Sequence, residues 1–293
     1  AVNPAALYRA VVECDLVFGW FASWHTFFPV LFARQQQKPS VVVSGGYDVA
    51  RMPEIGYGSM QNGFKRWIAQ KTLQRATLVI AFSQFSCTEV ITNAHLSQEQ
   101  VRLIYLGLAD TRESKEPKDE LVITVANVDT SNLERKGLTA FVRAAAHFPE
   151  TPFVLIGAWR DDAIDKLRDI ASPNVTFTGY LEQVQLETYL ARAQVYVQAS
   201  RHEGFGLAVA EAMLHECVPV VTRVGALPEV VGDAGIYADS PEPEALARAI
   251  QRGLERDCSL GRQARERIMS TFPLEKRRQR LFNLVHELLE RPV

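Results

Sequence analysis

The sequence contains few cysteines and no closely spaced pair of them. Its 293 residues include four cysteines, and no C-x-x-C motif is present. This spacing argues against the disulfide framework of a small extracellular domain. We therefore expect reduced thiols in a cytoplasmic protein at Cys14, Cys87, Cys217 and Cys258.

Long hydrophobic runs are also absent. The longest apolar stretch, residues 16–32, is interrupted by Gly19, Ser23, His25 and Pro29. It falls short of the ~20 apolar residues that a membrane-spanning helix needs. The N-terminus has no signal-peptide pattern. We expect a cytoplasmic protein, with contact at the membrane surface as the alternative.

A strong excess of one charge is missing as well. The net charge is −2, with 47% hydrophobic and 23% charged residues, which is typical of a soluble globular protein and gives no support for nucleic-acid binding. Residues 1–115 hold 11 Lys and Arg against 8 Asp and Glu, or +3, which leaves −5 for the remainder. This asymmetry fits either a basic face toward an anionic membrane or acceptor, or simple scatter.

No D-x-D motif is present to hold a divalent ion. The adjacent acids Asp161 and Asp162 instead predict the start of a helix, where negative charge interacts favourably with the helix dipole. We therefore expect no metal site and no cofactor.

What is present is a regular alternation of apolar β-type runs and helical patterns, which predicts an α/β fold with doubly wound parallel sheets. The expected strands are Leu16–Phe18, Ser40–Val43, Thr77–Phe82, Val101–Tyr105, Leu121–Ala126, Phe153–Ile156, Val175–Thr178, Val195–Gln198, Val218–Val221 and Gly235–Tyr237. The expected helices are Trp24–Gln37, Gly63–Arg75, Phe85–Asn93, Gly137–His147, Asp161–Ile170, Leu186–Ala193, Glu242–Glu255, Gly261–Ser270 and Pro273–Glu290.

The charged, Pro-containing stretch over residues 110–120 predicts a linker between two domains. We place an N-terminal Rossmann-like domain at residues 1–112, a second at 113–272, and a final helix at 273–293 that packs back on the first. A full doubly wound domain needs about 150 residues. The N-terminal domain is therefore either reduced or begins before this chain does.

The most informative motif is the pair Glu203 and Glu211 around a Gly-Phe-Gly turn. The pair follows an expected strand, and ligands of open α/β sheets bind at that edge. Gly204 and Gly206 leave backbone N–H groups exposed before a helix, where phosphate binds well. The alternative has Glu203 acting on the helix dipole and Glu211 paired with an arginine, Arg201 or Arg223. Carboxylates beside such amides indicate a nucleotide-sugar site.

The segments H-E-G-F-G-L-A-V-A-E-A-M, V-P-V-V and G-A-L-P-E-V-V closely resemble the donor-binding core of retaining GT-B glycosyltransferases of family 4. The upstream L-V-I-T-V-A-N-V, R-K-G-L and N-V-T-F-T-G-Y-L are similar to the same family, so the resemblance is strong over residues 120–245. It implies two Rossmann-like domains facing each other across a cleft, with the acceptor on the N-terminal side.

The resemblance also implies roles for individual residues. Glu203 would bind hydroxyls of the donor sugar, Glu211 the ribose hydroxyls, and Lys136 the diphosphate. Backbone amides would hold sugar and phosphate oxygens at Gly204, Phe205, Gly206 and Leu207. It further implies a metal-independent reaction without a protein base.

The sequence departs from the family pattern at three places; one, Glu216 in place of a small residue, should affect packing more than chemistry, and the other two concern the site. Asn127 stands where the family usually has an arginine, and Arg135 either compensates or is a solvated loop charge. The family histidine after the second strand is replaced by Gly45-Gly46-Tyr47-Asp48, so Asp48 either orients a substrate or only forms a turn. His25 and His202 are each more typical of a structural or loop histidine than of a catalytic one, and of the two we assign His202, next to Glu203, to the lining of the site.

An aromatic cluster near the N-terminus predicts a buried core or a partner interface, with a lipid or hydrophobic acceptor site, or membrane contact, as the alternatives. Its members are Phe18, Trp20, Phe21, Trp24, Phe27 and Phe28. The cluster could join two copies of the chain into an oligomer.

Together these features predict a hexosyltransferase that uses a nucleotide-diphosphate sugar as co-substrate. The acceptor would be a saccharide, a lipid-linked molecule or a small molecule. The alternatives are a nucleotide-sugar-binding partner subunit with little activity, and a nucleotide-sugar epimerase.

Overall fold

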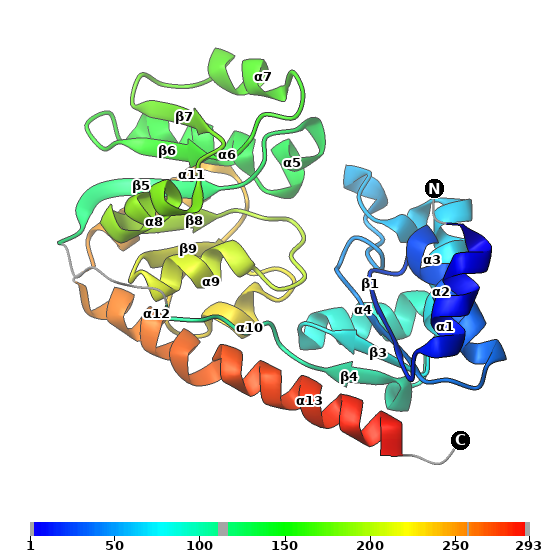
Figure 1. The fold of residues 1–293 in the computed structure, drawn as a ribbon. Helices are drawn as coiled ribbons and strands as arrows, with labels where there is room; N and C mark the ends of the chain where they lie inside the picture. The colour runs from blue at the N-terminus through cyan, green and yellow to red at the C-terminus, as the bar shows by residue number, and fades with distance from the viewer. Residues whose placement is uncertain (1–2, 111–116, 257, 291–293) are drawn as a thin grey trace. The chain divides into compact units, whose positions relative to one another are not determined.

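The computed structural model describes residues 3–110, 117–256 and 258–290. The chain divides into two compact units: unit 1 comprises Ala1–Gly107 with Leu274–Val293, and unit 2 comprises Leu108–Pro273 (Figure 1). Most of the linker expected over residues 110–120 falls on 111–116, outside the described residues.

Unit 1 is built on a parallel four-stranded sheet in the order β1-β2-β3-β4. Its strands are β1 (Val17–Trp20), β2 (Ser40–Val43), β3 (Leu78–Ala81) and β4 (Val101–Leu103). Every residue of β2 and β3 is buried. This explains why both strands are almost continuously apolar, as strands covered on both faces must be.

Polar side chains cap the N-termini of helices in unit 1. Asn62 accepts from the amide of Lys65 (3.1 Å) and Ser83 from that of Ser86 (3.0 Å), which satisfies N–H groups that lack a partner within the helix. The helices are α1 (Pro4–Glu13), α2 (Trp24–Gln35), α3 (Gly63–Arg75), α4 (Gln84–Ala94) and α13 (Leu274–Glu290), with short 3₁₀ turns η1 (Pro53–Ile55), η2 (Ser59–Gln61) and η3 (Gln98–Gln100).

Helix α13, the last element in the chain, belongs to unit 1. Arg277 donates to the backbone carbonyls of Ile104 (3.1 Å) and Tyr105 (2.8 Å). Leu284 and Leu288 are buried. These contacts tie the C-terminal helix to a unit formed mainly by the first 107 residues.

Unit 2 contains a parallel six-stranded sheet in the order β10-β9-β8-β5-β6-β7. Its strands are β5 (Asp119–Val125), β6 (Phe153–Ile156), β7 (Val175–Gly179), β8 (Ala193–Gln198), β9 (Val218–Thr222) and β10 (Ile236–Ala238). The order runs outward from β5 in one direction and from β8 in the other. The strand order therefore reverses between these two neighbours, which defines a topological switch point.

The helices of unit 2 bury an apolar core against this sheet, including Leu138, Phe141, Phe153, Val195 and Leu246. They are α5 (Thr130–Arg135), α6 (Leu138–Ala144), η4 (Ala145–His147), α7 (Ala163–Asp169), α8 (Gln183–Arg192), α9 (Leu207–Leu214), α10 (Leu227–Val231), α11 (Pro243–Leu254) and α12 (Cys258–Thr271).

The predicted α/β fold with two parallel-sheet domains is confirmed, and each expected strand corresponds to an observed one. Helix α7 begins at the predicted place, with Asp162 as its N-cap. The sequence reading missed α1, α5 and α10. Helices α5 and α10 span only six and five residues, too few for a helical period to show.

Of the two alternatives expected for the aromatic cluster, a buried core is wrong for most of its members, and a partner interface stays a prediction. Phe27 is buried, at 7% exposure. The other five rings are each at least 36% exposed: Phe18, Trp20, Phe21, Trp24 and Phe28. The periodicity of α2 places Phe27 inward and leaves Trp24 and Phe28 on its outer side.

Candidate functional site

The candidate site of unit 2 lies at its switch point, where the carboxyl ends of β5 and β8 are neighbours. The chain after β5 forms α5 and then reaches Lys136. The chain after β8 forms a loop, residues 199–206, that contains Glu203 and leads into α9. A parallel sheet thus brings together two loops that are 67 residues apart at these side chains.

Close backbone approaches fix these loops to each other. Gly137 has φ +65°, and a Cβ atom there would lie 2.2 Å from the carbonyl oxygen of Ala199. Arg201 donates its amide to the carbonyl of Arg135 at 2.8 Å. Only glycine fits at position 137, because it needs both the left-handed conformation and the missing side chain.

The loop after β9 closes on the same segment. The amide of Ala226 donates to the carbonyl of Glu203 at 2.9 Å. A Cβ atom on Gly225, whose φ is +56°, would lie 2.3 Å from that oxygen. Backbone contacts therefore hold the loop that contains Glu203 between the loops after β5 and β9.

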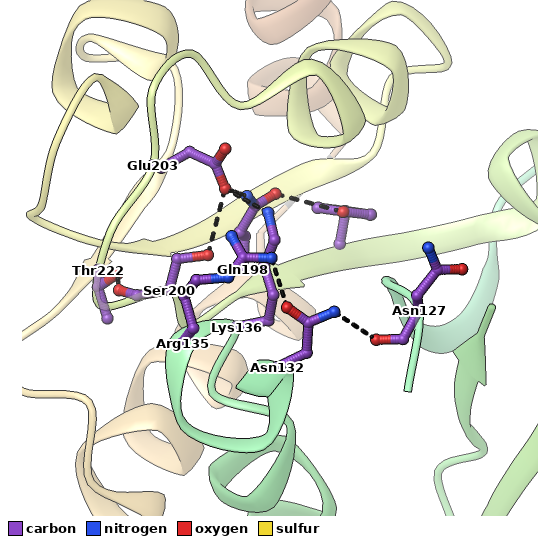
Figure 2. A network of polar contacts seen from close by, with 9 residues as sticks. Asn127, Asn132, Arg135, Lys136, Gln198, Ser200, Glu203 and Thr222 are labelled. Carbon is purple, nitrogen blue, oxygen red and sulfur yellow. Dashed lines mark hydrogen bonds and ion pairs between the residues drawn. The ribbon is translucent and has the colours of Figure 1, made fainter. Parts of the chain in front are cut away.

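Three donors converge on one carboxylate oxygen of Glu203, as Figure 2 shows. Its Oε2 accepts from Lys136 Nζ at 2.6 Å, from Gln198 Nε2, and from Ser200 Oγ at 3.4 Å. The Lys136 and Glu203 side chains are 19% and 12% exposed. Such a largely desolvated, charge-assisted contact is stronger than a surface ion pair.

The surrounding charges keep Glu203 ionised. Burial alone would raise the pKa of the Glu203 carboxyl, but the Lys136 ammonium, with smaller effects from Arg135 and His202, holds it below its usual value. The site therefore keeps an ionised Glu203 carboxylate beside Lys136 at neutral pH.

Arg135 belongs to this network and is not a freely solvated loop charge. Its Nη2 donates to Asn132 Oδ1, and Asn132 Nδ2 in turn donates to the carbonyl of Asn127 at 2.9 Å (Figure 2). Asn127 contributes its backbone and leaves its side chain exposed. The structure thus brings Arg135 to the site and gives Asn127 a place at its edge.

The Gly-Phe-Gly turn leads directly into α9. Gly206 is the N-cap with φ +96°, and no side chain caps the helix. The Phe205 ring is 3% exposed and packs edge-on against Phe272, with centroids 5.4 Å apart. Phe205 therefore anchors the turn by its side chain, while Gly204, Phe205, Gly206 and Leu207 supply the backbone at the start of the helix.

Glu211 lies on α9, partly exposed among buried apolar neighbours. Burial, and to a lesser degree the Glu187 carboxylate, raise the pKa of Glu211. Neither arginine considered as its partner contacts it: Arg201 pairs with Glu134 at 3.1 Å, and Arg223 lies over the Tyr237 ring at 3.9 Å. In the described part of the chain, the Glu211 carboxyl has no hydrogen-bond or ion-pair partner.

The two histidines lie in different units and have different surroundings. His25 contacts Ser23 Oγ at 2.7 Å and the carbonyl of Trp20 at 2.8 Å, so its ring fixes the loop after β1. His202 is buried, at 3% exposure, beside Glu203, and it contributes to lowering the pKa of that carboxyl.

Asp48 lies in unit 1, at the carboxyl edge of β2. It is 4% exposed, and its two oxygens accept from the amides of Ala22 (2.8 Å) and Gly45 (2.9 Å). Burial raises the pKa of Asp48 although these hydrogen bonds oppose the rise. Asp48 therefore joins the loops after β1 and β2, and its catalytic role stays a prediction.

The same edge of unit 1 encloses a cavity of about 650 Å³. Aromatic and other apolar groups form much of its wall, with Asp48 and Lys65 among the polar residues. Its other lining residues include Phe21, Trp24, Tyr47, Phe64 and Ile68.

Sequence reasoning missed three residues that organise the site: Gln198, Ser200 and Asn132. Gln198 and Ser200 donate to Glu203, and Asn132, 7% exposed, orients Arg135. Gln198 was detectable as the polar residue that ends an otherwise apolar buried strand. Asn132 gave no signal, because α5 itself was not recognised.

No group of three or more His, Cys, Asp or Glu side chains within residues 3–110, 117–256 and 258–290 is arranged to hold a metal ion. Nor does any helix within these ranges have the length and apolarity to cross a bilayer.

Residues 119–256 match the model of the family described as "Glycosyl transferases group 1". The chain is 30% identical over 207 residues to O-antigen chain mannosyltransferase B of Escherichia coli, which covers 64% of this chain and 54% of that protein. It is 25% identical over 182 residues to MMP alpha-(1->4)-mannosyltransferase of Mycolicibacterium hassiacum, covering 58% and 44%. The chain thus spans about half the length of these curated relatives.

Solved structures share the fold. HepE from Anabaena, in complex with UDP and glucose, superposes with a TM-score of 0.80 at 20% identity, covering 97% of this chain and 80% of that one. Sucrose-phosphate synthase from Thermosynechococcus elongatus gives 0.77 at 22%, covering 97% and 76%.

The resemblance seen in the sequence therefore holds for the segment 119–256, which matches the group 1 glycosyltransferase family, and the two-sheet α/β fold matches that of GT-B glycosyltransferase structures.

Proposed function

We propose that this protein is a metal-independent, retaining glycosyltransferase that moves a hexose from a nucleotide-diphosphate sugar to an acceptor. The observation on which the proposal rests is the Lys136–Glu203 contact at the switch point of unit 2, beside the uncapped start of α9. It offers a cation and amides for phosphate, and a carboxylate for hydroxyl groups.

Each residue has a part in this proposal. Lys136 and Arg135 neutralise the diphosphate as it departs, and the first amides of α9 bind its oxygens. Glu203 accepts hydrogen bonds from the sugar, and Glu211, which has raised pKa and an open carboxyl, accepts from the ribose. We propose that unit 1 binds the acceptor.

The reaction proceeds by cleavage of the bond between the anomeric carbon and the phosphate oxygen, whose electron pair leaves with the nucleotide diphosphate. The acceptor oxygen bonds to the anomeric carbon on the same face and gives its proton to the leaving phosphate. No protein base is required, which fits a site whose buried carboxylate is already paired with a lysine.

Mannose is the first sugar to test, because two of the relatives are named mannosyltransferases. Thermal shifts with UDP-, GDP-, ADP- and TDP-linked mannose and glucose would identify the donor, since a ligand that binds only the folded state raises its melting temperature. The product's anomeric configuration, read by NMR with and without EDTA, tests retention and metal independence.

Glu211→Ala provides the decisive variant. We expect it to weaken nucleotide-diphosphate binding about tenfold or more in calorimetric titration, because a hydrogen bond to a charged group contributes about 1.5–3 kcal/mol. Unchanged UDP and GDP affinity contradicts the ribose assignment. A changed sugar formed without acceptor indicates an epimerase, and binding without transfer or hydrolysis indicates a partner subunit.

A further inference from the structure

The outer side of helices α2 and α3 has features that donor binding does not use. The two helices lie side by side over the sheet of unit 1 (Figure 1). Residues three, four or seven positions apart share one face of a helix. We call the outer surface of the two helices the α2–α3 face: Trp24 and Phe28 on α2 and Phe64, Trp67 and Lys71 on α3 follow this spacing, and Arg34 of α2 lies beside Lys71 around one surface depression.

One end of the α2–α3 face is aromatic and exposed. Phe64 is 63% exposed, Trp24 57%, Trp67 46% and Phe28 40%. The rings contact one another across the two helices: Trp24 and Phe64 have centroids 5.7 Å apart, and Phe64 stacks on Trp67 at 6.4 Å and 13°. A contiguous apolar patch of large rings in water marks an interaction surface.

The other end is basic. Arg34, Lys71 and Arg75 gather around one surface depression, and Lys65 and Arg66 flank the aromatic rings in sequence. Neither helix contains an acidic residue. Among the residues that the structure describes, none of these five cations forms an ion pair with a carboxylate.

The net charge of the segment that contains the α2–α3 face differs from that of the whole chain. Residues 16–83 contain seven Lys and Arg against two Asp and Glu, a balance of +5, whereas the whole chain carries −2. One of the two acids, Asp48, is buried and bonded to backbone amides. The exposed surface of this segment is therefore more strongly cationic than the count alone shows.

We infer that the α2–α3 face docks on an anionic lipid bilayer. Aromatic side chains partition into the headgroup region, and nearby Lys and Arg are attracted to lipid phosphates. A second copy of the chain fits the charge less well, because a two-fold interface sets each patch against itself and brings like cations together.

Docking would also bring the unit 1 cavity to the lipid. Trp24 and Phe64 belong both to the α2–α3 face and to the wall of that cavity. The cavity would then open beside the headgroups, where it could meet an acceptor carried by the bilayer.

Vesicle binding by the full chain tests this inference. We expect the chain to sediment with vesicles of phosphatidylcholine and phosphatidylglycerol, but not with phosphatidylcholine alone, and to be released by salt because a Debye length is only about 8 Å at physiological ionic strength. Arg34→Gln/Lys71→Gln should weaken binding about 25-fold, since each cation near the surface contributes roughly fivefold. Trp24→Ala/Phe64→Ala should weaken it tenfold or more.

Matched controls come from exposed residues of unit 2. Arg143→Gln/Arg248→Gln and Tyr180→Ala should leave vesicle binding unchanged. The four tryptophans provide a readout without disturbing the face: Trp20, Trp24 and Trp67 lie in unit 1, and Trp159→Phe removes the only one in unit 2. Brominated lipid should quench the emission of this variant.

Four outcomes would overturn the inference. The first two are equal binding to neutral and anionic vesicles, and no binding at low salt. The others are no quenching of Trp159→Phe by brominated lipid, and a dimer that Trp24→Ala/Phe64→Ala dissociates without any vesicle binding. Transfer activity is not needed for any of these measurements, so they stand apart from the donor assignment.

Discussion

At the carboxyl edge of each parallel sheet, the loops after two neighbouring strands come together, but the two sets of loops carry different kinds of side chain. In unit 2, the loops after β5 and β8 bring Lys136 and Glu203 together. In unit 1, the loops after β1 and β2 surround an aromatic cavity, and their buried acid, Asp48, is bonded to backbone amides. A parallel sheet therefore fixes the place of a site, and the loop residues decide which ligand it suits.

The largest expected effect tests the paired charges of unit 2. Lys136→Met should lower the free energy of unfolding by about 3 kcal/mol, because it leaves a largely buried carboxylate without its cation. Transfer should fall about 10²–10³-fold. Urea unfolding and single-turnover transfer would measure the two effects.

Adding Glu203→Gln supplies the control. The double variant should regain much of the stability without regaining transfer. The lowered pKa of Glu203 determines how the pair's contribution to stability depends on pH. The pair stabilises the fold above pH 4.5, the pKa in the unfolded chain, and this contribution is lost as the pH falls through the folded pKa. Equal stability of the single and double variants would contradict this account.

The next effect tests the backbone frame of the site. Gly137→Ala should destabilise unit 2 by about 2–3 kcal/mol, since alanine must adopt φ +65° against the carbonyl of Ala199. Gly63→Ala in unit 1 is the matched control, because a Cβ atom there meets open space. Thermal unfolding should show a loss for the first variant and none for the second; equal midpoints would refute the close approach.

The smallest expected effects are changes in stability at two carboxyls, Asp48 and Glu211, whose pKa values are both raised by burial. Asp48 accepts two amides, so Asp48→Asn, which can accept at only one side-chain atom, should cost about 1 kcal/mol. Glu211 lacks a described partner, so Glu211→Gln should stabilise the fold by up to about 1 kcal/mol at neutral pH.

The raised pKa of Glu211 fixes the sign of this second change. A carboxyl that is harder to ionise when folded weakens the fold at neutral pH, and this penalty disappears as pH falls through its folded pKa. The gain from Glu211→Gln should therefore shrink toward acid pH in denaturant titrations. A gain that grows on acidification would show that the carboxyl has a favourable partner.

The sequence predicted the strands well, because buried parallel strands are almost uniformly apolar between polar turns. It also singled out Glu203, Glu211 and Lys136, which belong to a recognisable motif and whose roles stay predictions. The contacts between them depend on strand order, which sequence periodicity does not encode. Gln198 and Ser200 lie five and three residues before Glu203, and their contacts with it depend on the conformation of the loop after β8, which periodicity does not encode either.

The aromatic residues show what hydrophobicity alone does not predict, namely which rings of a helix are buried. For Trp24 and Phe28 the sequence predicted either a buried core or a partner interface, and the structure exposes both rings. A run of apolar residues predicts that a helix has an apolar face, but it does not predict which of those residues the sheet covers. Which side the sheet covers is settled by tertiary packing, as Phe27 shows.

The position of Lys136 and Glu203 on opposite sides of the strand-order reversal affects how the site could be divided. A chain cut between β7 and α8 would place the ammonium on one fragment and the carboxylate on the other. Each fragment would hold one arm of the sheet and half of the site. Donor recognition could then return only when β5 and β8 pair again, which makes this unit suited to a split reporter of fragment association.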